Sequence, residues 1–384
     1  HVIRVLTTIS EKQPEVRTET SPYPVLRRLH NRNRDRFFPR EILHDLQDTR
    51  RLQSEIERFK PDLIYLGHSY ILSKALLPFL ARQNMPMVYD EGGLSVIEAW
   101  TEHGRWFRFT GEWRSRFAPL NWIKPLVIRL VVSISHGRIK REWSWPSNMQ
   151  VIFNSRLNQQ NAAARGVPVE NSVVIHSGID TSLFTFQPRV GFSSPLRIFV
   201  PGRIERRKGQ LDALELLRQL TGAGIDARVT FAGAGWVDGY EEELKQAIER
   251  SALAEKITIL PMLTTTEMVE HYHDSDICFF SSYFRTGFSR IPLEAMACGC
   301  LVISYGNEGS DEIIRDGENG YLLQPGDFGQ ITHLIERLIS DSKKVSEITS
   351  SAREDIEVHH SMVAYVAEIE KLAALTQLGK FNVE

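Results

Sequence analysis

The sequence predicts an α/β protein with two parallel-sheet domains that face each other across a cleft. Short apolar runs alternate with amphipathic runs through the second half of the chain, and a less regular alternation occupies the first half. A segment rich in Pro, Gly and Ser, Phe186 to Leu196, separates the two halves. Alternating strands and helices form right-handed βαβ crossovers, which build a parallel sheet covered on both faces.

The individual elements follow from hydrophobic periodicity. In the first half, strands are expected over residues 2–8, 61–67, 86–90, 150–155 and 172–178, with helices over 40–59, 71–83 and up to 164. In the second half, strands are expected over 197–200, 228–233, 256–260, 277–281, 300–304 and 320–323, with helices over 210–220, 240–250, 266–274, 292–299 and 311–317. The predicted limits are residues 1–187 for the N-terminal domain, 188–195 for a linker, 196–365 for the C-terminal domain and 366–384 for a C-terminal helix or tail that returns to the first domain.

The bulk composition is that of a soluble globular protein. Among 384 residues, 42% are hydrophobic and 24% charged, and the formal net charge of −2 argues against a general nucleic-acid binder. Three cysteines are too few for a disulfide framework, so buried thiols and a cytoplasmic location are expected. The sequence contains no run of 18 apolar residues. The chain begins at His1 in a strand-like run, and roughly 30 residues are expected to precede it in the full protein.

Function in such folds lies on the loops at the carboxyl ends of the strands. In "VPGRIERRKGQ", Gly202 permits a tight turn, and Arg203 and Lys208 flank the start of a helix. A helix N-terminus with added cations suits a diphosphate, but a solvated basic turn has the same sequence.

A second loop, "FFSSYFRTGFSRIPLEAMACG", contains Gly287 and leads to Glu294 in the first turn of the next helix. This carboxylate either complements the helix dipole or accepts hydrogen bonds from a vicinal diol such as a ribose. "FAGAG" is an incomplete dinucleotide fingerprint, which argues against NAD or FAD. In "YGNEGSDEIIRDGENGYLL", the glycines and Ser310 form either a backbone nest near a ligand or an ordinary turn and N-cap.

Five segments in this order resemble family 4 of the retaining glycosyltransferases, nucleotide-sugar enzymes with the GT-B fold of two Rossmann-like domains. The segments are "VIHSGIDTSLF", "GRIERRKG", "FAGAG", "YFRTGFSRIPLEAMACGCLVIS" and "EGSDEIIRDGENGYLL", and the resemblance covers about Asn154 to Leu323. It implies transfer of a sugar from a nucleoside diphosphate donor, a UDP-sugar above all, to a glycan or lipid-linked glycan in polysaccharide or glycolipid biosynthesis. It also implies that no cofactor and no metal ion is needed, because Arg and Lys stabilise the leaving diphosphate.

The resemblance assigns roles by position. It makes Arg203 and Lys208 the catalytic cations on the diphosphate, and it puts Glu294 on the ribose hydroxyls. The remaining donor-binding residues that it implies are Gly202, Met262 at the base, Thr286, Gly287, Phe288 and Ser289.

Two departures from the family pattern bear on function. The family has two glutamates separated by seven residues, and Thr286 stands where the first would be. A threonine cannot hold two sugar hydroxyls, so either the donor differs or catalysis is slower. The second departure is the missing Gly-rich loop of the first domain. A catalytically weak or inactive homologue that acts as a nucleotide-binding scaffold or partner subunit is therefore the alternative function.

The acceptor side is less clear. Gly92 aligns with a family position that often carries His or Arg, and His68, Asp90 and Glu91 are the neighbouring candidates to serve instead. Each of them is better explained as a loop or capping residue than as a catalytic one.

The segment Trp100 to Trp145 holds six of the seven tryptophans. Between Arg105 and Arg141 there are nine Arg or Lys residues and one Glu, interleaved with aromatic residues. Such a mixture suits an interfacial helix on an anionic membrane, and it equally suits an internal helix pair with a solvated basic side. The sequence therefore leaves open a peripheral membrane surface through Trp106–Ile134.

Overall fold

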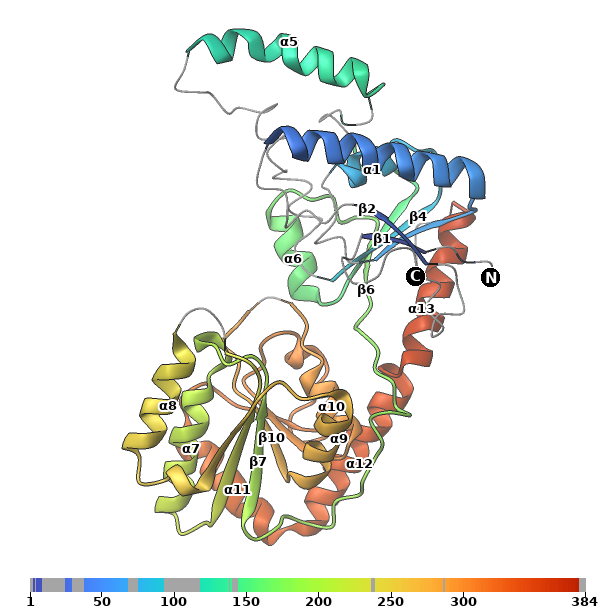
Figure 1. Cartoon of the computed structure of the whole chain (residues 1–384). Coiled ribbons are helices and arrows are strands. Elements are labelled where there is room, and N and C mark those ends of the chain that lie inside the picture. The colour runs from blue at the N-terminus through green and yellow to red at the C-terminus, as the bar shows by residue number, and fades with distance from the viewer. Residues whose placement is uncertain are drawn as a thin grey trace. The chain divides into compact units, whose positions relative to one another are not determined.

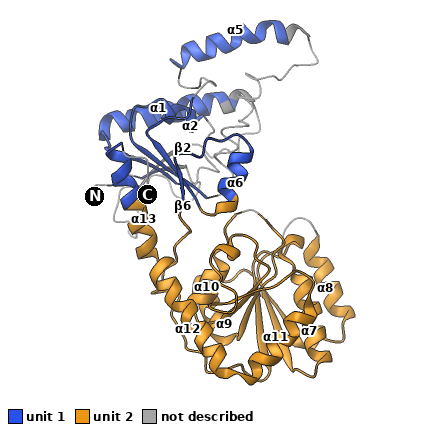
Figure 2. Cartoon of the chain, turned by 180° about the vertical axis from the view of Figure 1, so that it is seen from behind, with its two compact units in different colours: residues 1–153, 158–174, 371–384 blue, residues 154–157, 175–370 orange. Residues whose placement is uncertain are grey.

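The computed structural model describes residue 3 and residues 5–8, 25–29, 38–67, 75–92, 118–137, 139, 144–235, 239–285 and 287–379. The chain divides into two compact units, coloured in Figure 2. Unit 1 comprises residues 1–153, 158–174 and 371–384, and unit 2 comprises residues 154–157 and 175–370. Two helices cross this division along the chain, α6 (Arg156–Ala164) and α13 (Met362–Gln377).

Unit 2 is built on a six-stranded parallel sheet with the order β12-β11-β10-β7-β8-β9. Its strands are β7 (Leu196–Pro201), β8 (Ala227–Ala232), β9 (Ile257–Leu260), β10 (Ile277–Phe280), β11 (Leu301–Ser304) and β12 (Tyr321–Leu322). All six predicted strands of the second half are therefore confirmed. The order places β10 and β7 at the centre, where the strand order reverses along the chain.

Helices cover both faces of this sheet, as Figure 1 shows. They are α7 (Gln210–Gly222), α8 (Tyr240–Arg250), α9 (Thr265–Asp274), α10 (Ile291–Ala297), α11 (Phe328–Ser340) and α12 (Ser342–His359). Ile198 and Val200 of β7 join the core with α7, α8 and α11, whereas Phe199 between them joins the core with α9, α10 and α12. The period-two alternation of the strand thus separates two apolar cores.

Local sequence explains several helix ends. Thr264 and Glu267 form a reciprocal capping box at the start of α9, which satisfies two backbone N–H groups. Pro292 stands in the first turn of α10, where its missing N–H has no helical partner to lose. Both features are visible in the sequence, and both helices were predicted.

The helix predicted over residues 311–317 is wrong. Only a short 3-10 turn forms, η5 (Ser310–Glu312), after Gly309 in the left-handed region. The Asn319 side chain accepts from the Arg315 N–H and donates to the Ile313 carbonyl, so it binds the backbone groups that a helix would use.

Unit 1 has a four-stranded parallel sheet with the order β3-β4-β5-β6 and a parallel pair β1-β2. Its strands are β1 (Val5–Thr8), β2 (Val25–Leu29), β3 (Ile64–Gly67), β4 (Met87–Glu91), β5 (Met149–Phe153) and β6 (Ser172–Val174), and β2 was not predicted. The helices α1 (Phe38–Phe59), α2 (Leu76–Ala81) and α6 pack on the four-stranded sheet around Tyr89, Val151 and Phe153.

A further helix of unit 1, α5 (Ala118–Ile134), lies beyond α1, away from that sheet, in both Figures 1 and 2. Its residues Val127, Ile128 and Val131 pack against Ala75 and Ile139. Among the described residues, no helix combines the length and the apolar character that crossing a membrane requires.

The predicted linker is anchored to unit 2. The Arg189 guanidinium donates to the carbonyls of Gly299, Tyr272 and His273, and Asp276 accepts from the backbone N–H groups of Ser193 and Arg197. The domain limits drawn from the sequence stay a prediction.

Candidate functional site

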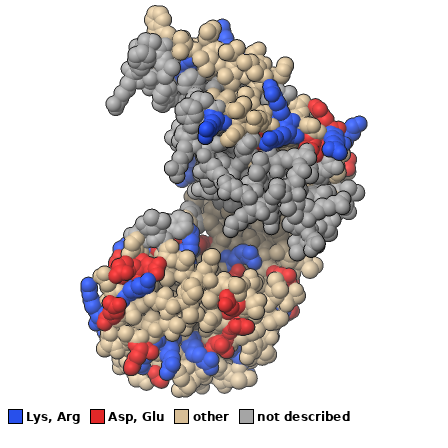
Figure 3. All heavy atoms as spheres, viewed as in Figure 1, with Lys and Arg blue, Asp and Glu red and all other residues tan. Residues whose placement is uncertain are grey.

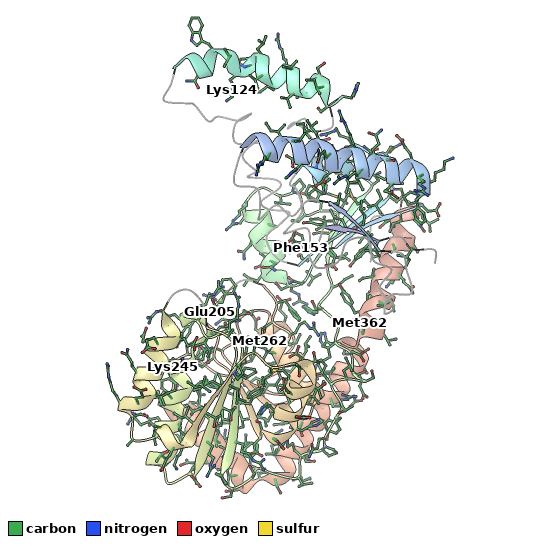
Figure 4. The ribbon with its side chains drawn as sticks, in the orientation of Figure 1. Lys124, Phe153, Glu205, Lys245, Met262 and Met362 are labelled. Carbon is green, nitrogen blue, oxygen red and sulfur yellow. The ribbon has the colours of Figure 1, made fainter. Side chains whose placement is uncertain are left out.

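The predicted donor residues of unit 2 follow neighbouring strands of its sheet. Arg203 and Lys208 come after β7, residues 287–289 and Glu294 come after β10, and Met262 comes after β9. Because all these strands are parallel, their carboxyl ends meet at one edge of the sheet. Figure 4 labels two residues from this edge, Glu205 and Met262.

The loop after β7 concentrates positive charge around one buried carboxylate. Glu205 is 2% exposed, and it lies 3.3 Å from the Arg203 guanidinium and 3.0 Å from that of Arg207. The Arg203 side chain nevertheless remains 45% exposed. Glu205 therefore forms ion pairs with two guanidinium groups, and both side chains stay accessible to an anion, since Arg207 is 39% exposed.

Lys208 ends the 3-10 turn η3 (Arg206–Lys208), and its ammonium is held internally. Its Nζ donates to both oxygens of Glu308, at 2.5 and 2.7 Å, and the two side chains are 11% and 8% exposed. Ser282 Oγ also donates to Glu308. The predicted phosphate-binding lysine is thus paired with a carboxylate from the loop after β11.

Gly209 brings this loop onto the loop after β10. It has a φ of 69°, and a Cβ added there would lie 2.2 Å from the Ser281 carbonyl oxygen. Ser281 Oγ donates to the carbonyls of Lys208 and Gly209, and the Tyr283 N–H donates to the Arg207 carbonyl at 2.8 Å. Only a glycine permits this backbone approach in the left-handed region.

The loop after β10 is fixed by contacts on both sides. The Gly287 carbonyl accepts from Ser155 Oγ at 3.2 Å, and the Ser289 N–H donates to the Glu308 carbonyl at 2.9 Å. The Phe288 ring stacks on His176 with centroids 5.2 Å apart. Thr286 lies outside the described residues.

Glu294 stands in the first turn of α10 with its side chain 15% exposed. Tyr272, which is fully buried, donates its O–H to Glu294 Oε2 at 3.1 Å, and the Arg290 Nε lies 3.8 Å from Oε1. Burial raises the pKa of Glu294, and the Arg290 charge and the Tyr272 hydrogen bond offset part of that rise. One carboxylate oxygen is thus oriented by a buried phenol, while the other faces a half-exposed guanidinium.

Gly202 and Met262 occupy opposite kinds of position. The Gly202 N–H donates to the Ala232 carbonyl, and a Cβ on Gly233 would lie 2.0 Å from the Gly202 oxygen. The close packing of the two backbones explains why Gly233, the first glycine of "FAGAG", has no side chain. Met262 is 79% exposed, so its side chain is available to a ligand and contributes little to the core.

Three of the predicted acceptor-side residues, Asp90, Glu91 and Gly92, belong to unit 1 at the carboxyl end of β4. Asp90 accepts from the Tyr65 hydroxyl at 2.5 Å, and Glu91 is fully buried and accepts from the Tyr89 hydroxyl at 2.7 Å. Gly92 follows directly. His68 lies outside the described residues.

Sequence reasoning missed a second carboxylate network, centred on Glu312. Its carboxylate accepts from the N–H groups of Arg156 and Leu157 and lies 2.9 Å from His176 Nε2. Burial raises the pKa of Glu312, but the hydrogen bonds from His176 and Arg156 outweigh it and leave that pKa below its usual value. Glu312 therefore caps the start of α6 and also contacts His176, on which the Phe288 ring stacks.

Sequence reasoning also missed Glu205 and Glu308. Glu205 lies within the quoted loop, two residues from each of its partners Arg203 and Arg207, so its charge was visible locally. Glu308 has no such signal, because it pairs with a lysine 100 positions away and adopts a φ of 52° that non-glycine residues seldom take. Ser310, expected in a nest or a cap, is 1% exposed and hydrogen-bonded to Ser304 Oγ and the Asn307 carbonyl. Its hydroxyl is therefore used inside unit 2.

Metal ligands and surface charge both bear on how this edge of unit 2 could bind an anion. In the part of the chain that the structure describes, no three or more His, Cys, Asp or Glu side chains are grouped as metal ligands. On the face of unit 2 seen in Figure 3, acidic and basic side chains are interspersed. Anion binding at this edge therefore depends on the individual cations described above.

Comparison with solved structures identifies the fold. HepE from Anabaena, solved in complex with UDP-glucose, matches with a TM-score of 0.62 and 22% identity over 91% of this chain and 86% of that one. Sucrose-phosphate synthase from Thermosynechococcus elongatus matches with a TM-score of 0.64 and 18% identity over 97% and 88%. These matches, with the two parallel-sheet units, confirm the predicted GT-B fold.

Sequence comparison identifies similar proteins. The amylovoran biosynthesis glycosyltransferase AmsK of Erwinia amylovora is 29% identical over 228 residues, which are 57% of this chain and 55% of that protein. The chain spans less than two thirds of the length of the first curated relatives it matches. Residues 186–355, which carry the loops with Arg203, Lys208 and Glu294, match the family model of the glycosyl transferases group 1.

Proposed function

We propose that this protein is a retaining, metal-independent glycosyltransferase of polysaccharide or glycolipid biosynthesis. It transfers a sugar from a nucleoside diphosphate donor, with UDP-sugars favoured, to a glycan or lipid-linked glycan. The observation that carries the proposal is the set of Arg203, Lys208 and Glu294 at one sheet edge of unit 2, inside the residues that match the family model. The UDP-glucose complex of HepE and the name of AmsK support the donor and the pathway class.

The proposed chemistry is electrostatic. Departure of the diphosphate builds negative charge on its oxygens, and cations fixed in advance stabilise that charge without reorganisation. Arg203, held by Glu205, and Lys208 supply these cations, and the Glu294 carboxylate accepts hydrogen bonds from the ribose. The leaving phosphate takes the proton of the acceptor hydroxyl on the same face of the sugar. Activity is accordingly expected to survive EDTA.

Isothermal titration calorimetry with UDP tests the phosphate assignment. Arg203→Ala removes a charge-assisted hydrogen-bond donor, so UDP binding should weaken about 10- to 100-fold. Arg218→Ala is the matched control, because Arg218 is an exposed α7 residue paired only to its helix neighbour Glu215 among its described contacts. Equal affinities of the Arg203 variant and the parent would refute the assignment.

Lys208→Ala should also weaken UDP binding, but it leaves Glu308 buried without its cation and so costs stability. The arginine variant is therefore the cleaner test. Thermal shifts with UDP, GDP, ADP and CMP identify the base, because a specific ligand raises the apparent stability by mass action.

Thr286 is the sequence feature that favours the alternative function, a scaffold without turnover. The sequence has threonine where the related family has a glutamate on the donor sugar. Thr286→Glu should change the donor preference or the rate of transfer. A variant with unchanged donor preference and unchanged rate would show that Thr286 controls neither. A parent protein that binds UDP but turns over no donor would establish the scaffold function.

We infer in addition that α5 docks on an anionic membrane, which would bring a lipid-linked acceptor within reach from the cytoplasmic side. Its outer face exposes Trp122 by 88%, Leu126 by 70% and Leu130 by 59%, three side chains at a spacing of four residues. The helix contains Lys124 and Arg129 and no acidic residue, and its surface in Figure 3 is largely uncharged. Apolar side chains flanked by basic residues are what an anionic lipid surface binds.

Flotation with phosphatidylglycerol vesicles at low salt tests this docking. The parent should float, and Trp122→Glu combined with Leu126→Glu should not. Val190→Glu is the control, since Val190 is equally exposed at 88% but belongs to unit 2. A parent that fails to bind these vesicles contradicts the membrane interface.

A further inference from the structure

The structure pairs Lys208 with a negative charge of its own. Both oxygens of Glu308 accept from the Lys208 ammonium, at 2.5 and 2.7 Å, in surroundings that leave each side chain about a tenth exposed. Two buried charges interact strongly because little water screens them. A diphosphate that binds Lys208 must therefore share this cation with Glu308 or displace it.

Glu308 is held firmly in that position. Its φ of 52° lies in the left-handed region, its carboxylate accepts from Ser282 Oγ, and its carbonyl accepts from the Ser289 N–H at 2.9 Å. Its neighbour Asn307 donates from Nδ2 to the Ser282 carbonyl at 2.7 Å. The carboxylate is therefore fixed by the loops after β10 and β11 as well as by the lysine, and it cannot simply swing away when an anion arrives.

Resting on the proposed function, we propose that Glu308 acts through Lys208 to weaken binding of the nucleoside diphosphate product more than binding of the donor. The reason is charge. UDP carries one more negative charge than UDP-glucose, because its terminal phosphate has a second ionisation with a pKa near 6. Because the Glu308 carboxylate offsets much of the Lys208 charge, the more highly charged product loses more electrostatic attraction than the donor does, which favours its release.

Calorimetry with UDP and with UDP-glucose at pH 8 tests this inference. Glu308→Gln keeps an acceptor for Ser282 and removes the charge, so UDP affinity should rise about 10-fold and UDP-glucose affinity about 5-fold, in proportion to their charges. Glu308→Gly is the second variant, because glycine adopts the observed φ without strain and should fold even where glutamine does not. In both variants, UDP affinity should rise more than UDP-glucose affinity.

Glu243→Gln is the matched control. Glu243 pairs with Arg206 of the same turn, but the two side chains are 42% and 68% exposed, so solvent screens the pair and affinities should change less than twofold. Weaker UDP binding by the Glu308 variants, or equal gains for UDP and UDP-glucose, would overturn the inference. The proposed function is tested separately, by whether the parent binds UDP and Arg203→Ala weakens that binding. Failure of the Glu308 inference can therefore be told apart from failure of the proposed function.

Discussion

Gly209 offers a single-residue test of how the two phosphate-side loops are assembled. In Gly209→Ala, the new Cβ would lie 2.2 Å from the Ser281 carbonyl oxygen and 3.1 Å from its Oγ, so the backbone of one loop must move. The contacts at risk are the two hydrogen bonds from Ser281 Oγ and the one from the Tyr283 N–H to Arg207. The change should therefore displace Lys208 without touching its side chain.

The magnitude follows from these contacts. An alanine at a φ of 69° costs about 1–2 kcal/mol by conformation alone. The single hydroxyl proton of Ser281 is shared between its two acceptors and counts as one hydrogen bond, so the loss of this bond and of the Tyr283 bond adds about 2 kcal/mol and the total loss in free energy of unfolding is about 3–4 kcal/mol. UDP binding should fall by at least about 10-fold, since a displaced ammonium loses a charge-assisted hydrogen bond.

Gly224→Ala isolates the conformational part. Gly224 has a φ of 79° and an added Cβ would meet no atom within 4 Å, so this control should lose only about 1–2 kcal/mol and keep its UDP affinity. In scanning calorimetry, the Tm of Gly209→Ala should be about 5–10 °C lower than the Tm of Gly224→Ala. Equal Tm values and equal UDP affinities for the two variants would refute the described packing of the loops.

Three further predictions concern unit 2. Burial, with the charges of His176 and His359, lowers the pKa of His360 to about 4, below its unfolded value near 6.5. The unfolded chain then binds the proton first, so stability measured by urea denaturation should fall by about 3 kcal/mol as the pH drops from 6.5 to 4, and His360→Gln should flatten this slope. Glu312→Gln should lower the free energy of unfolding by about 1–2 kcal/mol, because it weakens the cap on α6 and the contact with His176. Burial raises the pKa of the thiols of Cys298 and Cys300 to about 12 and that of Cys278 well above its usual value, so the native protein should resist a thiol reagent at pH 8 that labels all three in urea.

Each of these has a contrary result. A pH slope unchanged in His360→Gln would mean that other groups cause the acid loss. Glu312→Gln with parental stability would show that the cap is replaced by water. Rapid labelling of the native thiols would contradict the buried positions of the cysteines, which are at most 1% exposed.

Much of the fold could be predicted because its signals are local. The apolar runs of β7 to β12 and the helical spacing of α7 to α10 are read from a few neighbouring residues, and all of them form. A helix was predicted over residues 311–317, where only the 3-10 turn Ser310–Glu312 forms. The Asn319 side chain, which binds the backbone of this segment, lies outside the predicted range. β1 lies within the strand predicted over residues 2–8, whereas β2 was missed because two consecutive arginines interrupt its apolar run, VLRRL.

The site was less predictable, because its groups meet across long separations. Motifs indicated Arg203, Lys208 and Glu294. The neighbouring sequence does not show that Glu308 pairs with Lys208 or that Tyr272 donates a hydrogen bond to Glu294. These partners determine the charge and direction of the predicted groups. The distribution of charge at the site therefore required the tertiary structure.

Release of nucleoside diphosphate from a panel of nucleotide sugars, with an acceptor glycan and in EDTA, measures directly whether this protein transfers sugars without a metal ion. At least one donor should turn over, with a UDP-sugar favoured and with retention of the anomeric configuration by NMR, and Arg203→Ala but not Arg218→Ala should lose at least about 10-fold in rate. UDP binding without turnover of any donor would contradict the proposed function.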